Sequence, residues 1–117
     1  MKTFFRLAML IVAVAFFGVA TQAQTRVTDT LKVSGNCEMC RTRITESCFI
    51  RGVKSADWNP ETQNLIVTYN PKRTTLQAIA EKIASVGHDT KLVKATDKAY
   101  GALPNCCQYR EATNPMK

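Results

Sequence analysis

The sequence predicts a small α+β domain in which short strands alternate with two amphipathic helices. Residues 30–33 alternate polar and apolar side chains, and residues 65–69 are rich in β-branched and aromatic ones, as expected of strands. Residues 40–49 and 76–83 instead repeat apolar side chains at helical spacing. Since the whole chain has 117 residues, it can form one small domain and no more.

The first half of this domain is predicted to be a strand, a loop and a helix. The strand at residues 30–33 is interrupted by Gly35 and Asn36, which are turn-forming residues. A helix is then expected over residues 40–49, and Gly52 follows its end. One face of this helix would carry Cys40, Ile44, Ser47 and Cys48.

The middle of the chain is predicted to be a β-hairpin. Residues 53–59 form its first strand, with Ala56 and Trp58 on one face. Residues 59–62, Asn-Pro-Glu-Thr, have the composition of a turn, because proline presets the turn backbone. Residues 65–69 then form the returning strand.

The last part of the domain is predicted to be a helix and a fourth strand. Thr74 and Gln77 have the spacing of a capping pair, and Gly87 is a natural helix stop. Residues 88–95 alternate as a strand does. The resulting order is βαββαβ, which closes into a four-stranded antiparallel sheet with both helices on one face, the ferredoxin-like sandwich fold.

Residues 1–23 have the layout of a secretory signal peptide. Lys2 and Arg6 precede an apolar run at residues 7–20, and cleavage is expected after Ala23. That run of 14 residues is shorter than the roughly 20 that span a bilayer, so we expect no stable membrane span after cleavage. The mature protein is therefore expected to be periplasmic or secreted.

The mature chain would begin with a polar lead-in at residues 24–28. Because Lys2 and Arg6 leave with the signal, its net charge falls from +7 to +5. The basic residues are scattered and no motif that reads a nucleic-acid groove occurs, so we expect no nucleic-acid partner.

The cysteines are the residues of this sequence that indicate a chemical function. Five cysteines in a chain expected to be exported would ordinarily form disulfides, but an odd count leaves at least one thiol free, buried or bound to a ligand. Cys37 and Cys40 are three positions apart at the start of a helix, so both thiolates can reach one soft cation such as Cu(I), Hg(II) or Zn(II). A disulfide between Cys37 and Cys40 is the alternative.

The segment Val-Ser-Gly-Asn-Cys-Glu-Met-Cys, residues 33–40, resembles the metal loop of the heavy-metal-associated domain family. That family includes copper chaperones, extensions of copper ATPases and periplasmic mercury-binding proteins. The similarity covers residues 29–96, where the helix and strand patterns also match. This loop departs from the family pattern, because it is one residue shorter and lacks the usual methionine after glycine.

The resemblance implies a metal carrier and not an enzyme, with Cys37 and Cys40 as ligands and Cu(I) ahead of Hg(II) or Zn(II). Its partner would be a membrane metal transporter or another metal-binding domain, to which the ion passes by ligand exchange. The nearest rival is a periplasmic mercury-binding protein. Other rivals are a thiol–disulfide oxidoreductase that uses the Cys-x-x-Cys pair, and a sensor or interaction module with structural disulfides.

Three further residues are candidate ligands. In the predicted fold, the turn that carries His88 lies at the same end as the metal loop, so His88 is either a third ligand or a bystander. Residues 97–117 form a tail outside the domain pattern and contain Cys106 and Cys107. This tail either folds back to cap the ion or carries incidental thiols. Cys48 is expected to be a core residue.

Overall fold

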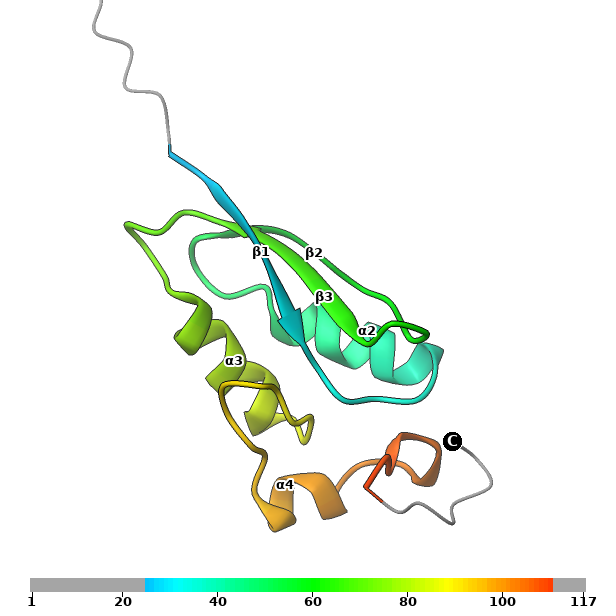
Figure 1. Cartoon of the computed structure of the whole chain (residues 1–117). Coiled ribbons are helices and arrows are strands. Elements are labelled where there is room, and N and C mark those ends of the chain that lie inside the picture. Colours follow the sequence, from blue (N-terminus) through cyan, green and yellow to red (C-terminus); the bar gives the residue numbers. More distant parts are fainter. Residues whose placement is uncertain (1–24, 111–117) are drawn as a thin grey trace, which may run out of the picture.

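The computed structural model describes residues 25–110 of the 117-residue chain. The predicted signal peptide, residues 1–23, lies outside the described residues, and so do residues 111–117 of the tail. The described part is an antiparallel sheet packed against helices, followed by a folded tail (Figure 1). The predicted α+β, ferredoxin-like class is confirmed.

The sheet has three strands in the order β1-β3-β2. Strand β1 spans Val27–Lys32, β2 spans Val53–Trp58 and β3 spans Asn64–Tyr69. Both pairings are antiparallel, and Leu65 of the central strand β3 lies opposite Leu31 of β1 and Trp58 of β2. These three side chains are buried on the inner face of the sheet.

Two helices complete this core. Helix α2 spans Glu38–Ser47, and helix α3 spans Leu76–Ser85. Their buried side chains join those of the sheet in one hydrophobic cluster, as the alternating and helical patterns predict. The largest fully buried apolar side chains of this cluster are Trp58, Ile44, Leu65, Ile79, Ile83, Val33 and Val67.

Residues 88–95 do not form the predicted fourth strand. They make one isolated bridge, between Val33 and Thr90, supported by the bond from the Lys91 N–H to the Lys32 carbonyl. Beyond the bridge, the Thr90 hydroxyl accepts hydrogen bonds from the backbone N–H groups of Leu92 and Val93. This side-chain turn competes with the sheet ladder, so the chain bends away where strand pairing would have continued.

Both helix starts differ by a residue or two from the prediction. Helix α2 begins at Glu38 with Cys37 as its N-cap, so Cys40 lies within the first turn. The N-cap of α3 is Thr75, whose hydroxyl accepts from the Ala78 N–H at 3.1 Å. The predicted capping pair of Thr74 and Gln77 is therefore wrong by one position.

The tail is folded against the domain. It contains helix α4, Asp97–Gly101, and a 3₁₀ turn η1, Asn105–Cys107. Figure 1 shows this orange and red segment running below the domain toward the loop between β1 and α2. Leu103 and Cys107 are buried in the common core. Among the described residues, no helix has the length and apolar character needed to cross a membrane.

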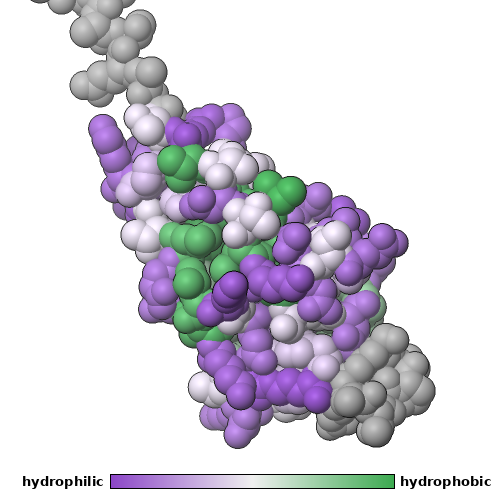
Figure 2. All heavy atoms as spheres, viewed as in Figure 1, coloured by the Kyte–Doolittle hydropathy of each residue, from purple (hydrophilic) through white to green (hydrophobic). Residues whose placement is uncertain are grey.

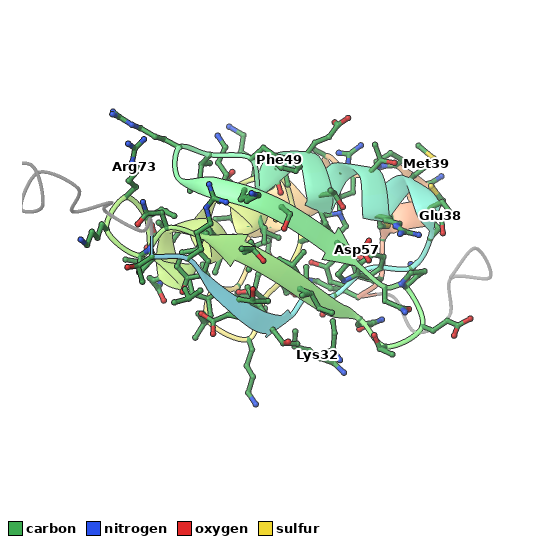
Figure 3. All side chains as sticks on the ribbon, turned by 90° about the horizontal axis from the view of Figure 1, so that it is seen from above. Lys32, Glu38, Met39, Phe49, Asp57 and Arg73 are labelled. Carbon is green, nitrogen blue, oxygen red and sulfur yellow. The ribbon has the colours of Figure 1, made fainter. Side chains whose placement is uncertain are left out.

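The face of the described part seen in Figure 2 is mainly hydrophilic, with hydrophobic side chains between the polar ones. The large hydrophobic side chains that remain exposed in the described part belong to different elements. They are Met39, Phe49, Ile66 and Leu92. Of these, Met39 lies at the end of α2 nearest the tail (Figure 3).

Replacing Trp58 with phenylalanine is expected to destabilise the fold by about 1–3 kcal/mol, because it removes a buried donor and leaves the Val33 carbonyl unpaired. The bond that would be lost runs from the indole Nε1 to that carbonyl at 2.9 Å. Urea unfolding measures the change. Ile66→Val, on the exposed face, is the control and should cost less than about 0.5 kcal/mol. Equal unfolding midpoints for wild type and Trp58→Phe would contradict the expectation.

Candidate metal centre

The loop from Val33 to Cys37 packs against the side chain of Trp58. The indole donates to the Val33 carbonyl, and its ring lies directly under Gly35. A Cβ atom on Gly35 would stand 2.9 Å from Trp58 Cη2 and 3.1 Å from the Cβ of Cys40. Only glycine permits this approach, so the loop sits close enough to α2 for the two thiols to meet.

Gln63 holds the same loop from the side. Its carbonyl accepts from the Val33 N–H at 2.9 Å, and its side-chain Nε2 donates to the Gly35 carbonyl at 2.9 Å. Gln63 adopts a positive φ of 60° in the β2–β3 turn, which aims the side chain at the loop. This role of Gln63 could not be predicted from the sequence, because a glutamine in a turn carries no sequence signal of its own.

Three thiols converge at the N-terminus of α2. Cys37 Sγ lies 3.6 Å from Cys40 Sγ and 3.9 Å from Cys107 Sγ. All three sulfur atoms lie within 4.8 Å of one another. The predicted candidates Cys37 and Cys40 are thus brought together, and one of the two tail cysteines joins them. All five cysteines are free thiols in the structure.

The neighbouring Cys106 is oriented differently. Its side chain is partly exposed, and its Sγ lies 3.4 Å from Met39 Sδ on the outside of α2. Its carbonyl faces the loop between β1 and α2 instead, accepting from Asn36 Nδ2 at 3.3 Å and from the Cys37 thiol at 3.6 Å. The backbone of Cys106 is therefore what joins the tail to the loop.

His88 does not belong to the thiol group. The buried ring places Nδ1 2.8 Å from the Ser34 carbonyl, so Nδ1 carries the proton and the other nitrogen has none. That nitrogen, Nε2, is buried without a hydrogen-bond partner. Burial lowers the pKa of His88, which favours this neutral form. His88 thus supports the loop backbone, and the ring stacks on Tyr109 with 5.5 Å between centroids.

Tyr109 and Arg110 fasten the tail to the turn after α3. The Tyr109 hydroxyl donates to the Gly87 carbonyl at 2.8 Å and accepts from the Asp89 N–H at 2.6 Å. Arg110 forms a two-point ion pair with Asp89, through Nε at 3.0 Å and a terminal nitrogen at 2.7 Å. The guanidinium also lies 4.5 Å from the centre of the Tyr100 ring. The pair makes two charge-assisted hydrogen bonds and is only about one-fifth exposed, so it holds the tail in a defined orientation.

The three thiols differ in acidity. Burial raises the pKa of Cys37, but hydrogen bonds with the Cys40 backbone and thiol, the Met39 backbone and the Cys106 side chain together outweigh it, so the net pKa is lowered. Burial raises the pKa of Cys40 and that of Cys107. A metal ion must therefore displace protons from at least two of these sulfurs.

Cys48 is a core residue, as the sequence predicts. Its side chain is fully buried, and its thiol donates to the Ile44 carbonyl at 3.1 Å. Burial raises its pKa to about 12, so it stays protonated and unreactive.

Comparison with known proteins gives one family. The family model described as the heavy-metal-associated domain matches residues 30–89, slightly more than half of the chain. A comparison with curated protein sequences found no match. The matched residues contain the second half of β1, α2, the hairpin and α3, but not the tail that brings Cys107 to the site.

Solved structures with this fold agree. The CopZ metallochaperone is 27% identical with a TM-score of 0.53, and the match covers 55% of this chain and 98% of CopZ. Oxidised MerP from Ralstonia metallidurans CH34 is 26% identical with a TM-score of 0.55, covering 57% and 96%. The water-soluble region of the P-type ATPase CopA from Bacillus subtilis is 31% identical with a TM-score of 0.55, covering 59% and 47%.

Cys37 is expected to react with iodoacetamide at lower pH than Cys40. Alkylation needs the thiolate, and a lowered pKa means that the thiolate forms earlier as pH rises. Peptide mass spectrometry of samples quenched across a pH series measures each site separately. Cys48 serves as the internal control and should react only after unfolding in urea. Identical pH profiles for Cys37 and Cys40 would refute this assignment of acidity.

Proposed function

Because the chain belongs to the heavy-metal-associated domain family, we propose that it carries a soft metal ion, Cu(I) first, bound between Cys37 and Cys40. The observation that carries the proposal is the 3.6 Å separation of these two sulfurs at the N-terminus of α2. Two thiolates suit Cu(I) or Hg(II), which are soft ions. The positive end of the helix favours the negative charge that the thiolates bring.

Transfer would proceed by exchange of thiolate ligands. Cys37 is partly exposed while Cys40 is fully buried, so an incoming thiol reaches the ion from the Cys37 side. Each exchange forms one metal–sulfur bond and breaks another. No bond within an organic substrate is made or broken, so the proposed role is not enzymatic.

The ligand set argues against a structural zinc site. Structural zinc is normally closed by four protein ligands, whereas three thiols meet here within the described residues. Hg(II) remains the rival ion, because it shares the preference for thiolates. A thiol–disulfide oxidoreductase is the rival activity, since Cys37 is the more acidic and the more exposed thiol of the pair.

The partner we propose is a membrane metal transporter or another metal-binding domain. One similar structure is the water-soluble region of a P-type ATPase, so this fold occurs on such transporters. A recipient with its own thiol pair can approach the exposed end of the loop, beside Glu38 and Met39 (Figure 3). Arg41 pairs with Asp57 at 2.8 Å and with Glu38 at 3.8 Å, so charges of both signs lie close to that end.

The reduced protein is expected to bind about one Cu(I) per chain, and Cys37→Ser/Cys40→Ser is expected to bind none, because serine supplies no soft ligand. Native mass spectrometry with Cu(I), Zn(II) and Hg(II) in parallel compares the ions directly. An insulin reduction assay on the same sample tests the rival activity and should show no turnover.

Cys48→Ala is the matched control, since it removes a thiol of the same helix region that does not contact the group. It should bind Cu(I) as the wild type does. Metal retained by the Cys37→Ser/Cys40→Ser protein, or rapid insulin reduction, would overturn the proposed carrier.

We also propose export, with cleavage after Ala23. The charged start, the apolar run and the small residues before Gln24 support this proposal. Expression of the full chain in a bacterium with two membranes should yield a periplasmic protein whose intact mass begins at Gln24. Recovery of the uncleaved chain from the cytoplasm would contradict it, and Ala23→Arg, which should block cleavage, is the control.

A further inference from the structure

We propose that Cys107, delivered by the folded tail, is a third thiolate ligand of the bound ion, while Cys106 is not a ligand. This inference rests on the proposed function and deepens it. The family match ends at residue 89, so it does not extend to the tail that carries Cys107. The site would then be a three-coordinate sulfur site and not an open pair.

The sulfur–sulfur distances favour three ligands. With a metal–sulfur bond of about 2.3 Å, a linear two-coordinate ion separates its sulfurs by about 4.6 Å, and a trigonal ion by about 4.0 Å. The observed distances from Cys37 Sγ are 3.6 Å to Cys40 and 3.9 Å to Cys107. The third pair, Cys40 and Cys107, is also within 4.8 Å. Two sides of the triangle are therefore shorter than a linear ion requires and close to the trigonal value, and the third side is no longer than 4.8 Å.

Burial separates the two tail cysteines. Cys107 Sγ is enclosed in the core cluster with Cys40, and its side chain has 0% exposure. The adjacent Cys106 Sγ lies on the outside against Met39, 3.8 Å from Cys107 Sγ. The 3₁₀ turn η1 thus directs one thiol inward and its neighbour outward.

The position of Cys107 is set by contacts on both sides of it in the chain. Before it, the Cys106 carbonyl accepts from Asn36 Nδ2. After it, Tyr109 and Arg110 bind the turn after α3 through the bonds to Gly87 and Asp89. None of these contacts involves a thiol–metal bond, so the third ligand is already in place before an ion arrives. Preorganisation of this kind raises affinity because little freedom is lost on binding.

Asn36 links the tail to the most unusual feature of the loop. It follows Gly35, where the family pattern has a methionine, and its side-chain amide donates to the Cys106 carbonyl at 3.3 Å. A shortened loop with a polar residue is therefore matched to an added tail.

A third thiolate also affects which ions the site prefers and how the bound ion is released. Three thiolates suit Cu(I) and Hg(II), which both accept trigonal sulfur sites. Cys40 and Cys107 are fully buried and Cys37 is not, so an incoming thiol would replace Cys37 first. The ion would leave only after the recipient has supplied ligands for the two buried bonds, which makes the protein retain its ion more firmly than an open pair would.

X-ray absorption of the Cu(I)-loaded mature chain counts the sulfur ligands directly. We expect about three sulfurs for wild type and Cys106→Ser, and about two for Cys107→Ser, since serine keeps the shape of the side chain but not the soft donor. Competition with a chromophoric Cu(I) chelator should show Cu(I) affinity falling by about tenfold or more in Cys107→Ser only. Near-UV circular dichroism of Trp58 checks that both variants remain folded.

Three outcomes decide the matter. Two sulfurs in the wild type, with tight binding that depends on Cys37 and Cys40, would overturn the third ligand and leave the carrier standing. Loss of affinity in Cys106→Ser equal to that in Cys107→Ser would overturn the assignment to Cys107. No Cu(I) or Hg(II) bound by the wild type would instead refute the proposed carrier itself.

Discussion

The contact between the Trp58 indole and Gly35 is the constraint on which the thiol site depends. The ring fills the space under the loop, and its N–H fixes the Val33 carbonyl at the point where β1 ends. Since Gly35 has no side chain, the loop lies directly on the ring, and Cys40 packs beside both. A bulkier residue at position 35 would lift the loop and separate Cys37 from Cys40. The geometry of the sulfurs is therefore a consequence of core packing in β2.

A second glycine, in the turn after α3, allows the tail to pack equally closely. Gly87 adopts a φ of +104°, and a Cβ there would stand 2.8 Å from the Ala99 carbonyl and from Leu103. The tail consequently packs directly against this turn. The Ser34 N–H donates to the Asp89 carbonyl at 2.8 Å, so the turn is also joined to the metal loop. The loop, the turn and the tail are therefore joined by hydrogen bonds, and the buried His88 ring contacts both Ser34 of the loop and Tyr109 of the tail.

Much of the fold could be predicted because the type of each element follows from the local pattern of apolar side chains. Leu65, Val67 and Tyr69 alternate with polar or exposed neighbours, and Ile79 and Ile83 repeat at helical spacing, so element types follow from burial periodicity. The prediction of a fourth strand at residues 88–95 was wrong because the Thr90 hydroxyl accepts from the Val93 N–H, which turns the backbone away from the sheet. The helix starts were displaced because several threonines and cysteines can serve as an N-cap, and tertiary contacts choose among them.

In the candidate site, too, local features could be predicted from the sequence and non-local contacts could not. The meeting of Cys37 and Cys40 follows from local geometry, because a three-residue spacing at a helix start places both thiols on one end. The role of His88 as a backbone support could not be predicted, since it depends on a bond to Ser34, 54 positions earlier in the chain.

The choice of Cys107 over Cys106 is likewise non-local. It results from how Tyr109, Arg110 and Asn36 dock η1, and adjacent cysteines look identical in a sequence. An ion at the triangle of sulfurs would sit between a loop ordered by the core and a tail ordered by Asp89 and Gly87. The loop and the tail thus hold the sulfur atoms from two different parts of the chain. Of these two, the tail joins the core cluster through fewer buried side chains, Leu103 and Cys107, so it is the part that can be displaced. Ligand exchange at Cys37 and displacement of the tail are therefore the two physical routes by which the ion could leave, and the exposed thiol makes the first the easier one.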